Sequence, residues 1–368
     1  MKVPFVDLAK QNYPLRNKIK KNFLKILDSG NYILGNELIN FENNFKKYIG
    51  NKFCVGVGSG TDALYLSLKA INLKKDDEVL TVSQSYLASA SCIHLAGGKI
   101  KFIDIKNDLN IDENLIAKKI NKNTRAIIVV HLTGRPANIK KIKEIIKKSQ
   151  IHQKIYLIED CSQAVGSTLD NKKVGSFGDF GCFSFHPLKN LAALGDGGAV
   201  VLNNKQKYNW LLKARNHGHP NRDDCDFFSH NMRLDTLQAG ILKIKLDNLE
   251  KTIKSRRKYA LYYQENLSKK IITIKEPVSV INTYHTYIVF CPKRDKLVKF
   301  LSKMGIETKI HYPKPIHKMK VFKDERFKDL KNTEILSKKI LSLPIAEYLT
   351  LEQIKYVTKN INHFYEKN

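Results

Sequence analysis

A lysine, a carboxylate and a hydroxyl occur close together in a glycine-rich stretch in the middle of the chain. Asp160 ends one apolar run, Ser184 ends a second, and Lys189 comes shortly before a Gly-Asp-Gly-Gly sequence. These groups suit pyridoxal 5'-phosphate (PLP), whose chemistry uses a lysine amine as a Schiff base, a carboxylate on the pyridine nitrogen and a hydroxyl on the phosphate. The stretch therefore predicts an active site with PLP as cofactor.

Neither charged residue carries this interpretation alone. Lys and Arg make up 64 of the 368 residues, so one more lysine is by itself weak evidence. Lys189 differs in its setting, because apolar Leu188 and Leu191 flank it and the surrounding stretch is poor in lysine. Asp160 alone fits equally well as a strand-end acid that caps the next turn. The prediction depends on their combination.

A second element with possible chemistry is Gly58-Ser-Gly-Thr-Asp62, which includes Gly60 and Thr61. It follows an apolar run and opens a helical pattern, and the free N–H groups at the positive end of a helix favour a phosphate. A Ser, Thr or Asp before a helix is also an ordinary N-cap. This element therefore supports a phosphate site only together with the downstream cluster.

An alternation of apolar runs and amphipathic stretches between about residues 53 and 203 must position these groups. It is typical of a mostly parallel sheet covered by helices on both faces, and ligands in such sheets bind beyond the carboxyl ends of the strands. The predicted strands are Phe53–Val57, Val79–Val82, Ile100–Ile105, Ala126–Leu132, Ile155–Ile158, Gly181–Phe185 and Ala199–Leu202. The predicted helices between them include Asp62–Ile71, Leu87–Ala96 and Ile139–Lys148.

The second part of the chain has a different pattern. A segment almost free of Pro and Gly predicts one long helix from Asp235 to about Ser268. Beyond Pro277 come separate strand and helix candidates, namely Tyr284–Phe290, Lys296–Lys303, Ile306–Ile310 and a final helix from Leu351. The predicted fold class is α/β, with a three-layer large domain over residues 1–249, N-terminal segment included, and a smaller α/β C-terminal domain over residues 250–368.

The formal net charge of +29 raises the question of a polyanionic partner. The positive residues are mostly lysines, spread singly or in pairs from Lys18 to Lys367. No zinc-finger spacing, aromatic RNA-binding signature or basic arm accompanies them. We therefore expect no nucleic-acid partner, and a basic surface would instead help to attract an anionic small substrate.

Cysteines and histidines give no sign of a metal or disulfide framework. The six cysteines are scattered without a C-x-x-C pair, which is typical of buried reduced thiols in a cytoplasmic protein. His219 and His230 lack carboxylate or Cys partners at metal-ligand spacing, so we expect loop histidines and no metal site. The sequence has no apolar signal region and no run that could span a bilayer, so we expect a cytoplasmic protein without membrane contact.

The stretch Ile158–Val201 closely resembles the DegT/DnrJ family of PLP-dependent sugar aminotransferases, which have the aspartate-aminotransferase fold (fold type I). It contains an acid-x-x-Gln motif, an S-F-x-x-x-K-N segment and a G-D-G-G turn. Shorter matching motifs, spread over nearly the whole chain, are Phe5–Leu8, Gly58–Leu68, Val130–Pro136, Arg215–Gly218, Asn231–Asp235 and His311–Pro313.

The resemblance implies a role for each matching residue at the cofactor. Lys189 and Asp160 would be catalytic, as the Schiff-base lysine and the partner of the pyridine nitrogen. The remaining cofactor residues would be Gln163 near the phenolic oxygen, Gly60, Thr61 and Ser184 on the phosphate, Tyr86 stacked on the ring, and Asn231 on the phosphate held by a neighbouring subunit. Taken without the resemblance, Tyr86 fits a core residue, Gln163 a turn residue and Asn231 a helix cap. The role of Asn231 implies a homodimer with shared active sites.

The resemblance also points to residues that select the substrate, namely His217, His311, Tyr312 and His317. The segment from Arg215 to His230 is less typical of the family. Leu188 stands where relatives often have Thr, so a polar contact beside the lysine is missing.

The implied reaction is transfer of an amino group from glutamate to a keto-(deoxy)sugar carried on a nucleoside diphosphate. The amino sugar would serve the biosynthesis of surface polysaccharide or glycoconjugate. The alternatives are amination of a non-nucleotide cyclic ketone such as an inosose, and PLP-dependent sugar dehydration. Related dehydratases have His at the position of Lys189, which argues against dehydration. The sugar, the nucleotide and the carbon that is aminated stay open.

Overall fold

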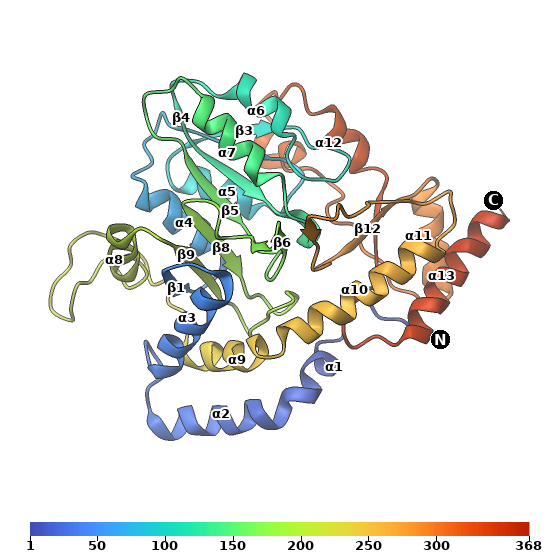
Figure 1. Cartoon of the computed structure of the whole chain (residues 1–368), viewed down its shortest axis with the longest axis horizontal. Helices are drawn as coiled ribbons and strands as arrows, with labels where there is room; N and C mark the ends of the chain where they lie inside the picture. The colour runs from blue at the N-terminus through green and yellow to red at the C-terminus, as the bar shows by residue number, and fades with distance from the viewer. Residues whose placement is uncertain (368) are drawn as a thin grey trace.

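The apolar runs between residues 53 and 203 form a seven-stranded β-sheet at the centre of the larger part of the protein (Figure 1). The computed structural model describes residues 1–367. Each strand predicted between residues 53 and 203 is confirmed, with bounds that differ by at most a few residues. Across the sheet the strands are β1 (Phe53–Val57), β9 (Gly198–Leu202), β8 (Phe180–Ser184), β5 (Tyr156–Asp160), β4 (Thr124–Val130), β2 (Glu78–Val82) and β3 (Lys99–Ile103).

The sheet is mostly parallel, as predicted. The strands β3, β2, β4, β5 and β8 pair in parallel, and β9 lies between β8 and β1 and is antiparallel to both. Val130 pairs with Asp160, and Ser184 pairs with Gly198. The carboxyl ends of β4, β5 and β8 and the start of β9 therefore meet at one edge of the sheet.

Helices cover both faces of this sheet. On one face lie α4 (Gly60–Ala70), α5 (Ala88–Leu95) and α8 (Lys205–Ala214). On the other lie α3 (Asn36–Ile49), α6 (Glu113–Lys119), α7 (Ile139–Lys148) and α9 (Thr236–Leu246).

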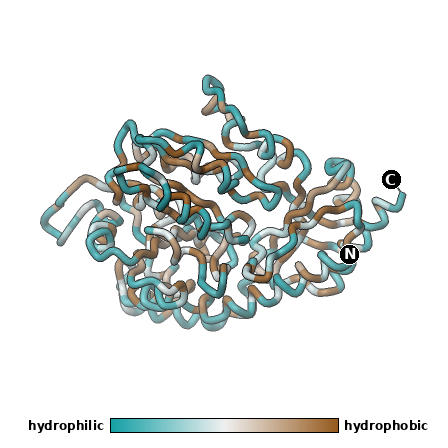
Figure 2. Tube along the Cα trace, turned by 45° about the horizontal axis from the view of Figure 1, so that its top comes forward, coloured by the Kyte–Doolittle hydropathy of each residue, from teal (hydrophilic) through white to brown (hydrophobic). Residues whose placement is uncertain are grey.

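Alternating side chains of each strand supply the two cores between these layers. In β1, Val55 and Val57 pack with α4 and α5, whereas Cys54 packs with α3 and α9. In β2, Val79 faces the first group of helices and Leu80 faces α6 and α7. Figure 2 shows the resulting apolar strands inside a more polar outer layer. The predicted three-layer arrangement is confirmed.

The last third of the chain builds a smaller α/β unit. Its antiparallel sheet consists of β10 (Ile272–Thr273), β12 (Tyr287–Phe290) and β13 (Ile340–Leu343). Its helices are α10 (Leu249–Asn266), α11 (Arg294–Lys303) and α13 (Leu351–Glu366). The short helix α12 (Lys331–Leu336) lies against the large domain instead, where the N–H groups of Asn332 and Thr333 donate to Asp104 after β3. A further small sheet joins the two parts of the chain through β11 (Val280–Ile281), β6 (Thr168–Leu169) and β7 (Lys172–Lys173).

The single long helix predicted after Asp235 is wrong, because α9 ends at Leu246 and α10 begins at Leu249. Asn248 lies at the break, and its side-chain amide donates to the Ile244 carbonyl at 2.9 Å. The same bond occurs at Asn44 inside α3 and at Asn360 inside α13, so it does not by itself explain the break. The proposed boundary between residues 249 and 250 falls at this break and stays a prediction.

One further expectation about the C-terminal part needs correction. The segment Ile306–Ile310 forms isolated bridges instead of a strand, from Ile306 to Val3 and from Lys309 to Ser342. Val3 is fully buried in the core of the smaller unit, and its N–H donates to the Gly305 carbonyl at 2.9 Å. The first residues therefore pack against the C-terminal part, because Val3 finds its apolar partners there. The predicted domain bounds stay a prediction.

The N-terminal helices follow this anchored segment. They are α1 (Leu8–Asn12), a 3-10 turn (Tyr13–Leu15) and α2 (Arg16–Ser29), which lies against α9 (Figure 1). Ile26 is the buried residue of α2, whereas Phe23, Leu24 and Leu27 are exposed. Among residues 1–367, no helix is both long and apolar enough to cross a membrane.

An aromatic cluster under β8 links the core to the edge where Ser184 lies. The Phe45 ring meets Phe183 edge-on at a centroid distance of 4.9 Å and Phe185 at 5.3 Å. Phe45→Ala is expected to lower the free energy of unfolding by about 3–5 kcal/mol, because it leaves a cavity among these rings. Denaturant unfolding measures the loss. Val278→Ala, at a fully exposed side chain, is the control and should change stability little; an equal loss in both variants would contradict this account of the core.

Candidate active site

A cavity of about 330 Å³ lies at the edge where the parallel strands end. The structure brings most of the predicted site residues together around it, although they come from distant parts of the chain. They are Gly60, Thr61, Tyr86, Asp160, Gln163, Ser184, Lys189, His311 and Tyr312. The side chains from β5, β8 and the start of α4 meet residues of the smaller C-terminal unit here.

Asp160 ends β5 and is almost completely buried. Its Oδ2 accepts a hydrogen bond from the Ser89 hydroxyl at 2.9 Å, and its Oδ1 accepts from the Ser162 N–H at 3.1 Å. The Ser89 hydroxyl also lies 2.8 Å from that of Ser85. These bonds fix the carboxylate at the wall of the cavity.

The neighbouring acid, Glu159, faces the opposite side of β5 and is fully buried. Its carboxylate accepts bonds from the N–H groups of Gly175, Phe177 and Gly178 at 2.7–2.8 Å and lies 3.1 Å from Nε2 of His131. Burial by itself raises the pKa of Glu159, but the hydrogen bond and charge of His131 and the backbone donors outweigh it and lower the pKa. This carboxylate orders the turn that leads into β8.

His131, Glu159 and Cys161 lie close enough together for a metal ion, since their donor atoms are within 4.8 Å of one another. Nδ1 of His131 accepts from the Ala137 N–H at 3.0 Å while Nε2 faces Glu159, so both ring nitrogens are engaged. Burial raises the pKa of Cys161 well above its usual value, which disfavours a thiolate ligand. The contacts fit a structural hydrogen-bond network.

The start of α4 and the end of β8 form a narrow cradle. Ser59 caps the helix, because its hydroxyl accepts from the Asp62 N–H at 3.0 Å. A Cβ atom on Gly60 would come within 2.6 Å of the Ser184 Cβ, so only glycine fits between the helix end and β8. The positive end of the helix and the Ser184 hydroxyl thus border the same part of the cavity, which suits a phosphate.

Lys189 lies in the wall of the cavity and is half-buried. Burial lowers the pKa of its amine from 10.5 to about 8, although the negative charge of Asp160 opposes the shift. An amine with this pKa is about one tenth unprotonated at pH 7 and half unprotonated at pH 8. It can therefore act as a nucleophile and as a base.

Gln163 and Tyr312 connect the large domain with the C-terminal part across the cavity. Oε1 of Gln163 accepts from the Thr133 N–H at 2.8 Å, and its Nε2 donates to the Tyr312 hydroxyl at 3.1 Å. The side-chain amide of Gln84 donates to the Tyr312 carbonyl at 3.0 Å. The Tyr86 ring, 62% exposed, lies 6.2 Å from the Tyr312 ring, so it is open to a ligand on one side.

His311 contributes an uncharged imidazole to the cavity. Its Nδ1 lies 2.9 Å from the Ser342 hydroxyl, and its ring stacks on Phe5 of the N-terminal segment. Burial, together with the positive charges of Lys189 and Lys309, lowers the pKa of His311 to about 4. The ring is therefore neutral at physiological pH.

His317 lies outside the group that lines the cavity, although the sequence predicts that it binds substrate. It is buried, its Nδ1 lies 2.7 Å from the Ser83 hydroxyl, and its Nε2 lies 3.2 Å from Glu334. Both ring nitrogens thus have protein partners. These contacts join the segment after His311 to Ser83, the residue that follows β2. Substrate binding by His317 stays a prediction.

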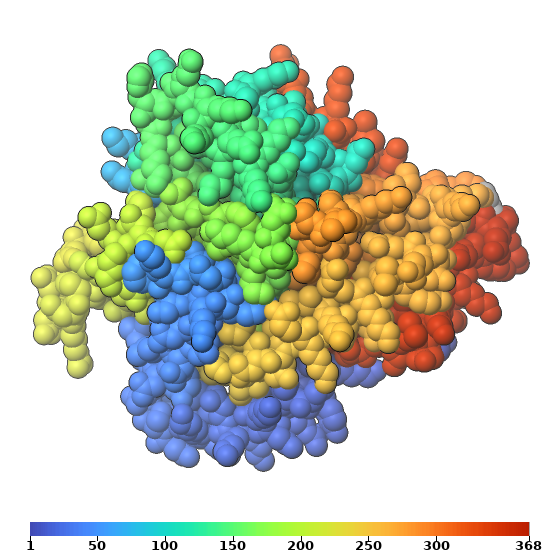
Figure 3. Space-filling model, viewed as in Figure 1, coloured from blue at the N-terminus to red at the C-terminus, as the bar shows by residue number. Residues whose placement is uncertain are grey.

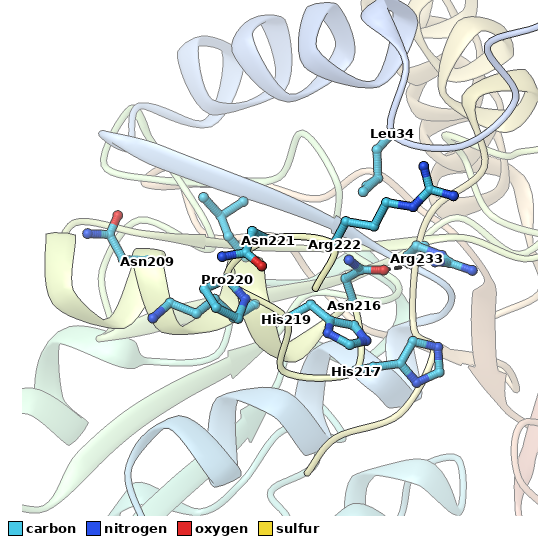
Figure 4. Close-up of a pocket in the computed structure, with 11 residues that line it drawn as sticks. Leu34, Asn209, Asn216, His217, His219, Pro220, Asn221, Arg222 and Arg233 are labelled. Atoms are coloured by element: carbon cyan, nitrogen blue, oxygen red, sulfur yellow. Dashed lines mark hydrogen bonds between the residues drawn. The ribbon is translucent and has the colours of Figure 1, made fainter. Parts of the chain in front are cut away.

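His217 and Asn231 also lie away from Lys189 within the same chain. His217 lines a second cavity of about 780 Å³ beside α8, which shares no lining residue with the first (Figure 4). Asn216 and Arg233 line it too, and Arg233 donates to the Asn216 side chain at 2.8 Å. Asn231 is exposed and bridges to Asn216.

The structure adds cavity residues that the sequence analysis missed, namely Ser59, Ser85, Ser89, Ser162, His186, Asp196 and His285. Ser85 and Ser89 lie in the stretch around Tyr86, where two hydroxyls four residues apart on a helical pattern were an available signal. His285 had no local signal. It enters the cavity from the C-terminal part through a contact that depends on the tertiary fold.

A mostly parallel seven-stranded sheet with a lysine of lowered pKa, an oriented carboxylate and a phosphate cradle at its carboxyl edge is the arrangement of a PLP-dependent enzyme. Residues 14–362 match the model of the DegT/DnrJ/EryC1/StrS aminotransferase family. The chain belongs to this family.

Individual relatives cover the whole chain. The dTDP-3-amino-3,6-dideoxy-alpha-D-galactopyranose transaminase of Aneurinibacillus thermoaerophilus is 36% identical, with 98% of this chain and 99% of the relative covered. The crystal structure of DesV from S. venezuelae superposes with a TM-score of 0.95 at 32% identity and covers 99% of each chain. The structure of NtdA from Bacillus subtilis with bound PMP has a TM-score of 0.93 at 25% identity, covering 99% of this chain and 85% of NtdA.

PLP is the cofactor of this family, and the cavity fits it. Lys189 offers the amine for the aldehyde, and Asp160 offers a fixed carboxylate for the pyridine nitrogen. Gly60 leaves the space beside Ser184 that a phosphate requires. The individual roles of these residues stay predictions.

The lowered pKa of Lys189 can be measured on the cofactor-free protein. Lys189 is expected to react with an amine-acylating reagent much faster than ordinary lysines at pH 8, because about half of its amine is neutral when the pKa is about 8. Below pH 8 its rate should fall about tenfold per pH unit as the amine becomes protonated. Mass spectrometry of peptides after brief labelling measures this profile. The fast site should vanish in Lys189→Arg, and a Lys189 rate that rises only near pH 10 would contradict the assignment.

Proposed function

We propose that the protein transfers an amino group from glutamate to a keto-sugar carried on a nucleoside diphosphate. The observation that carries the proposal is the Lys189 amine of lowered pKa in one cavity with the oriented Asp160 carboxylate and the cradle at Gly60 and Ser184. The relative from A. thermoaerophilus bears the name of a dTDP-amino-sugar transaminase, which supports the substrate class.

The chain's own residues account for the proton movements of such a reaction. Bound PLP supplies an electron sink for the charge that develops on the substrate carbon. Lys189, once its amine is free, takes a proton from the α-carbon of glutamate. In the reverse half-reaction it gives a proton to the sugar carbon that is aminated. Asp160, held by Ser89 and the Ser162 N–H, keeps a proton on the ring nitrogen. Glutamate leaves as 2-oxoglutarate, and its amino group passes to the sugar in a second, reverse half-reaction.

The surroundings of the cavity fit this task. The low pKa of Lys189 keeps a fraction of the amine neutral near pH 7–8, as a base requires. Tyr86 is exposed at the wall of the cavity and can stack on a planar ring. The lysine at position 189 favours amination over sugar dehydration, since the related dehydratases have His there. Five of the six free cysteines are buried, which is consistent with a cytoplasmic enzyme.

A substrate screen tests the proposal. With glutamate as donor, 2-oxoglutarate release is followed for TDP-, UDP- and GDP-linked keto-sugars and for an inosose. Turnover of at least one nucleotide sugar is expected, together with an absorbance band of the bound cofactor near 400–430 nm that Lys189→Ala lacks. Turnover of the inosose alone would overturn the substrate class. A wild-type protein that never takes up PLP would overturn the whole proposal.

The working unit is a homodimer whose two subunits share each active site. The exposed Asn231 stands apart from its own cavity, so it is free to reach the cofactor of a partner. The exposed apolar residues Phe23, Leu24 and Leu27 of α2 supply a surface suited to an interface. The segment between α8 and α9 contains Asn231, and it projects from the body of the protein in Figures 1 and 3.

Mixing two inactive variants tests the shared site. Lys189→Ala and Asn231→Ala are purified separately, unfolded or dissociated, and recombined in equal amounts with limiting PLP. Random pairing puts half of the dimers in the mixed form, and each mixed dimer has one site with both residues intact. About a quarter of the wild-type activity should therefore return. Light scattering verifies the dimer content of the mixture. If no activity returns in that sample, Asn231 does not act in the partner's active site.

A further inference from the structure

The loop around His285 is held firmly at the point where the C-terminal part meets the large domain. The Thr283 N–H donates to the Gly134 carbonyl at 3.2 Å, and the side-chain amide of Asn190 donates to the Thr283 carbonyl at 3.0 Å. Arg256 donates to the carbonyls of Tyr284 and His285 at 3.1 and 3.3 Å. The loop is thus fixed by the residue next to Lys189 and by a buried arginine.

The backbone of this loop is also strained. Tyr284 has a φ of 47°, in the left-handed region that bulky side chains rarely adopt. Such conformations cost of order 1–3 kcal/mol and persist where the surrounding structure enforces them, often at ligand sites. Here the strained residue directly precedes His285, and the result is that His285 lines the cavity beside Lys189 and His311.

The imidazole of His285 lacks a protein partner. Its Nδ1 is buried and has no hydrogen-bond partner within residues 1–367. Burial, followed by the positive charges of Lys189 and Arg256, lowers its pKa well below the usual value, so the ring is neutral. A buried polar atom without a partner costs free energy, and no protein group competes with a ligand in the cavity for a bond to this ring.

The positive charges of Lys189 and Arg256 lie near this imidazole, since both contribute to lowering its pKa. Asp160 and Asp196 are the acids of its wall, Lys189 is its one cationic side chain, and no arginine lines it among the described residues. Arg256 lies behind His285, but its guanidinium is occupied by Glu347 and by backbone carbonyls. Beside His285 an incoming carboxylate therefore meets the positive charges of Lys189 and Arg256, with the one N–H of the neutral imidazole as donor.

We propose that the imidazole of His285 hydrogen-bonds the α-carboxylate of the amino-acid donor and so selects amino acids in the first half-reaction. This inference rests on the proposed function. An amino acid carries its carboxylate directly on the carbon that reacts with Lys189, whereas the diphosphate of a nucleotide sugar is separated from the reacting carbon by part of the sugar ring. A partner so close to Lys189 therefore suits the carboxylate.

Equilibrium binding to the PLP-loaded enzyme tests this role without requiring turnover. Glutarate, an unreactive dicarboxylate of the same chain length as glutamate, is titrated while the absorbance of the bound cofactor is followed. His285→Phe keeps a ring of similar size, His285→Ala removes the ring, and His285→Asn restores one N–H donor. The Phe and Ala variants are expected to raise the Kd of glutarate about 10- to 100-fold, and Asn less, because the lost bond is to a charged group.

The controls separate this role from a structural one and from the proposed function. His152→Asn, at an exposed histidine, should leave the Kd for glutarate and the melting temperature unchanged. The nucleotide sugar accepted by the wild-type enzyme should bind the PMP form of the His285 variants with unchanged Kd. The inference is overturned if glutarate binds His285→Phe or His285→Ala with an unchanged Kd. It is also overturned if the Kd values of glutarate and of the nucleotide sugar rise equally. A wild-type enzyme without any half-reaction with glutamate would instead overturn the proposed function.

Discussion

The buried Glu159 carboxylate holds together the strand ends on which the active site depends. It accepts three backbone N–H groups from residues 175–178 and faces His131 at the end of β4. One side chain therefore ties β4, β5 and the turn before β8 at a single level of the sheet. Because side chains alternate along a strand, Asp160 must then face the other side, into the cavity. A buried charge needs such full pairing, which makes this arrangement specific as well as tight.

The electrostatics of the cavity follow from the same tight burial. The amine of Lys189 loses hydration, so its pKa falls to about 8, and its charge together with burial keeps His311 neutral. Of the two acids at the end of β5, Asp160 faces the cavity, and two hydrogen bonds hold its carboxylate there. The site thus combines an amine that can lose its proton, neutral imidazoles and an oriented anion. These are the properties that amino transfer through PLP requires.

The sequence predicts those features that depend on local order along the chain. Apolar runs mark the strands, and Asp160, Ser184 and Gly60 follow strand ends, so a parallel sheet brings them together. The contributions of His285, His311 and the Glu159 pair depend on contacts between segments more than a hundred residues apart or on which face a side chain takes. The partners of His317 could not be predicted either. Its motif lies next to the site in the sequence, but its ring contacts Ser83 and Glu334. The break at Asn248 leaves no signal in the sequence pattern, since the apolar spacing continues from Leu246 to Leu249.

The attachment point of the cofactor tests the central claim most directly. Borohydride reduction of the PLP-loaded wild-type enzyme makes the bond between the cofactor and its lysine permanent, and peptide mass spectrometry then locates the phosphopyridoxyl group. One labelled peptide is expected, with the group on Lys189, despite the many other lysines of the chain. A label on another lysine, or one spread over surface lysines while Lys189 stays unmodified, would contradict it.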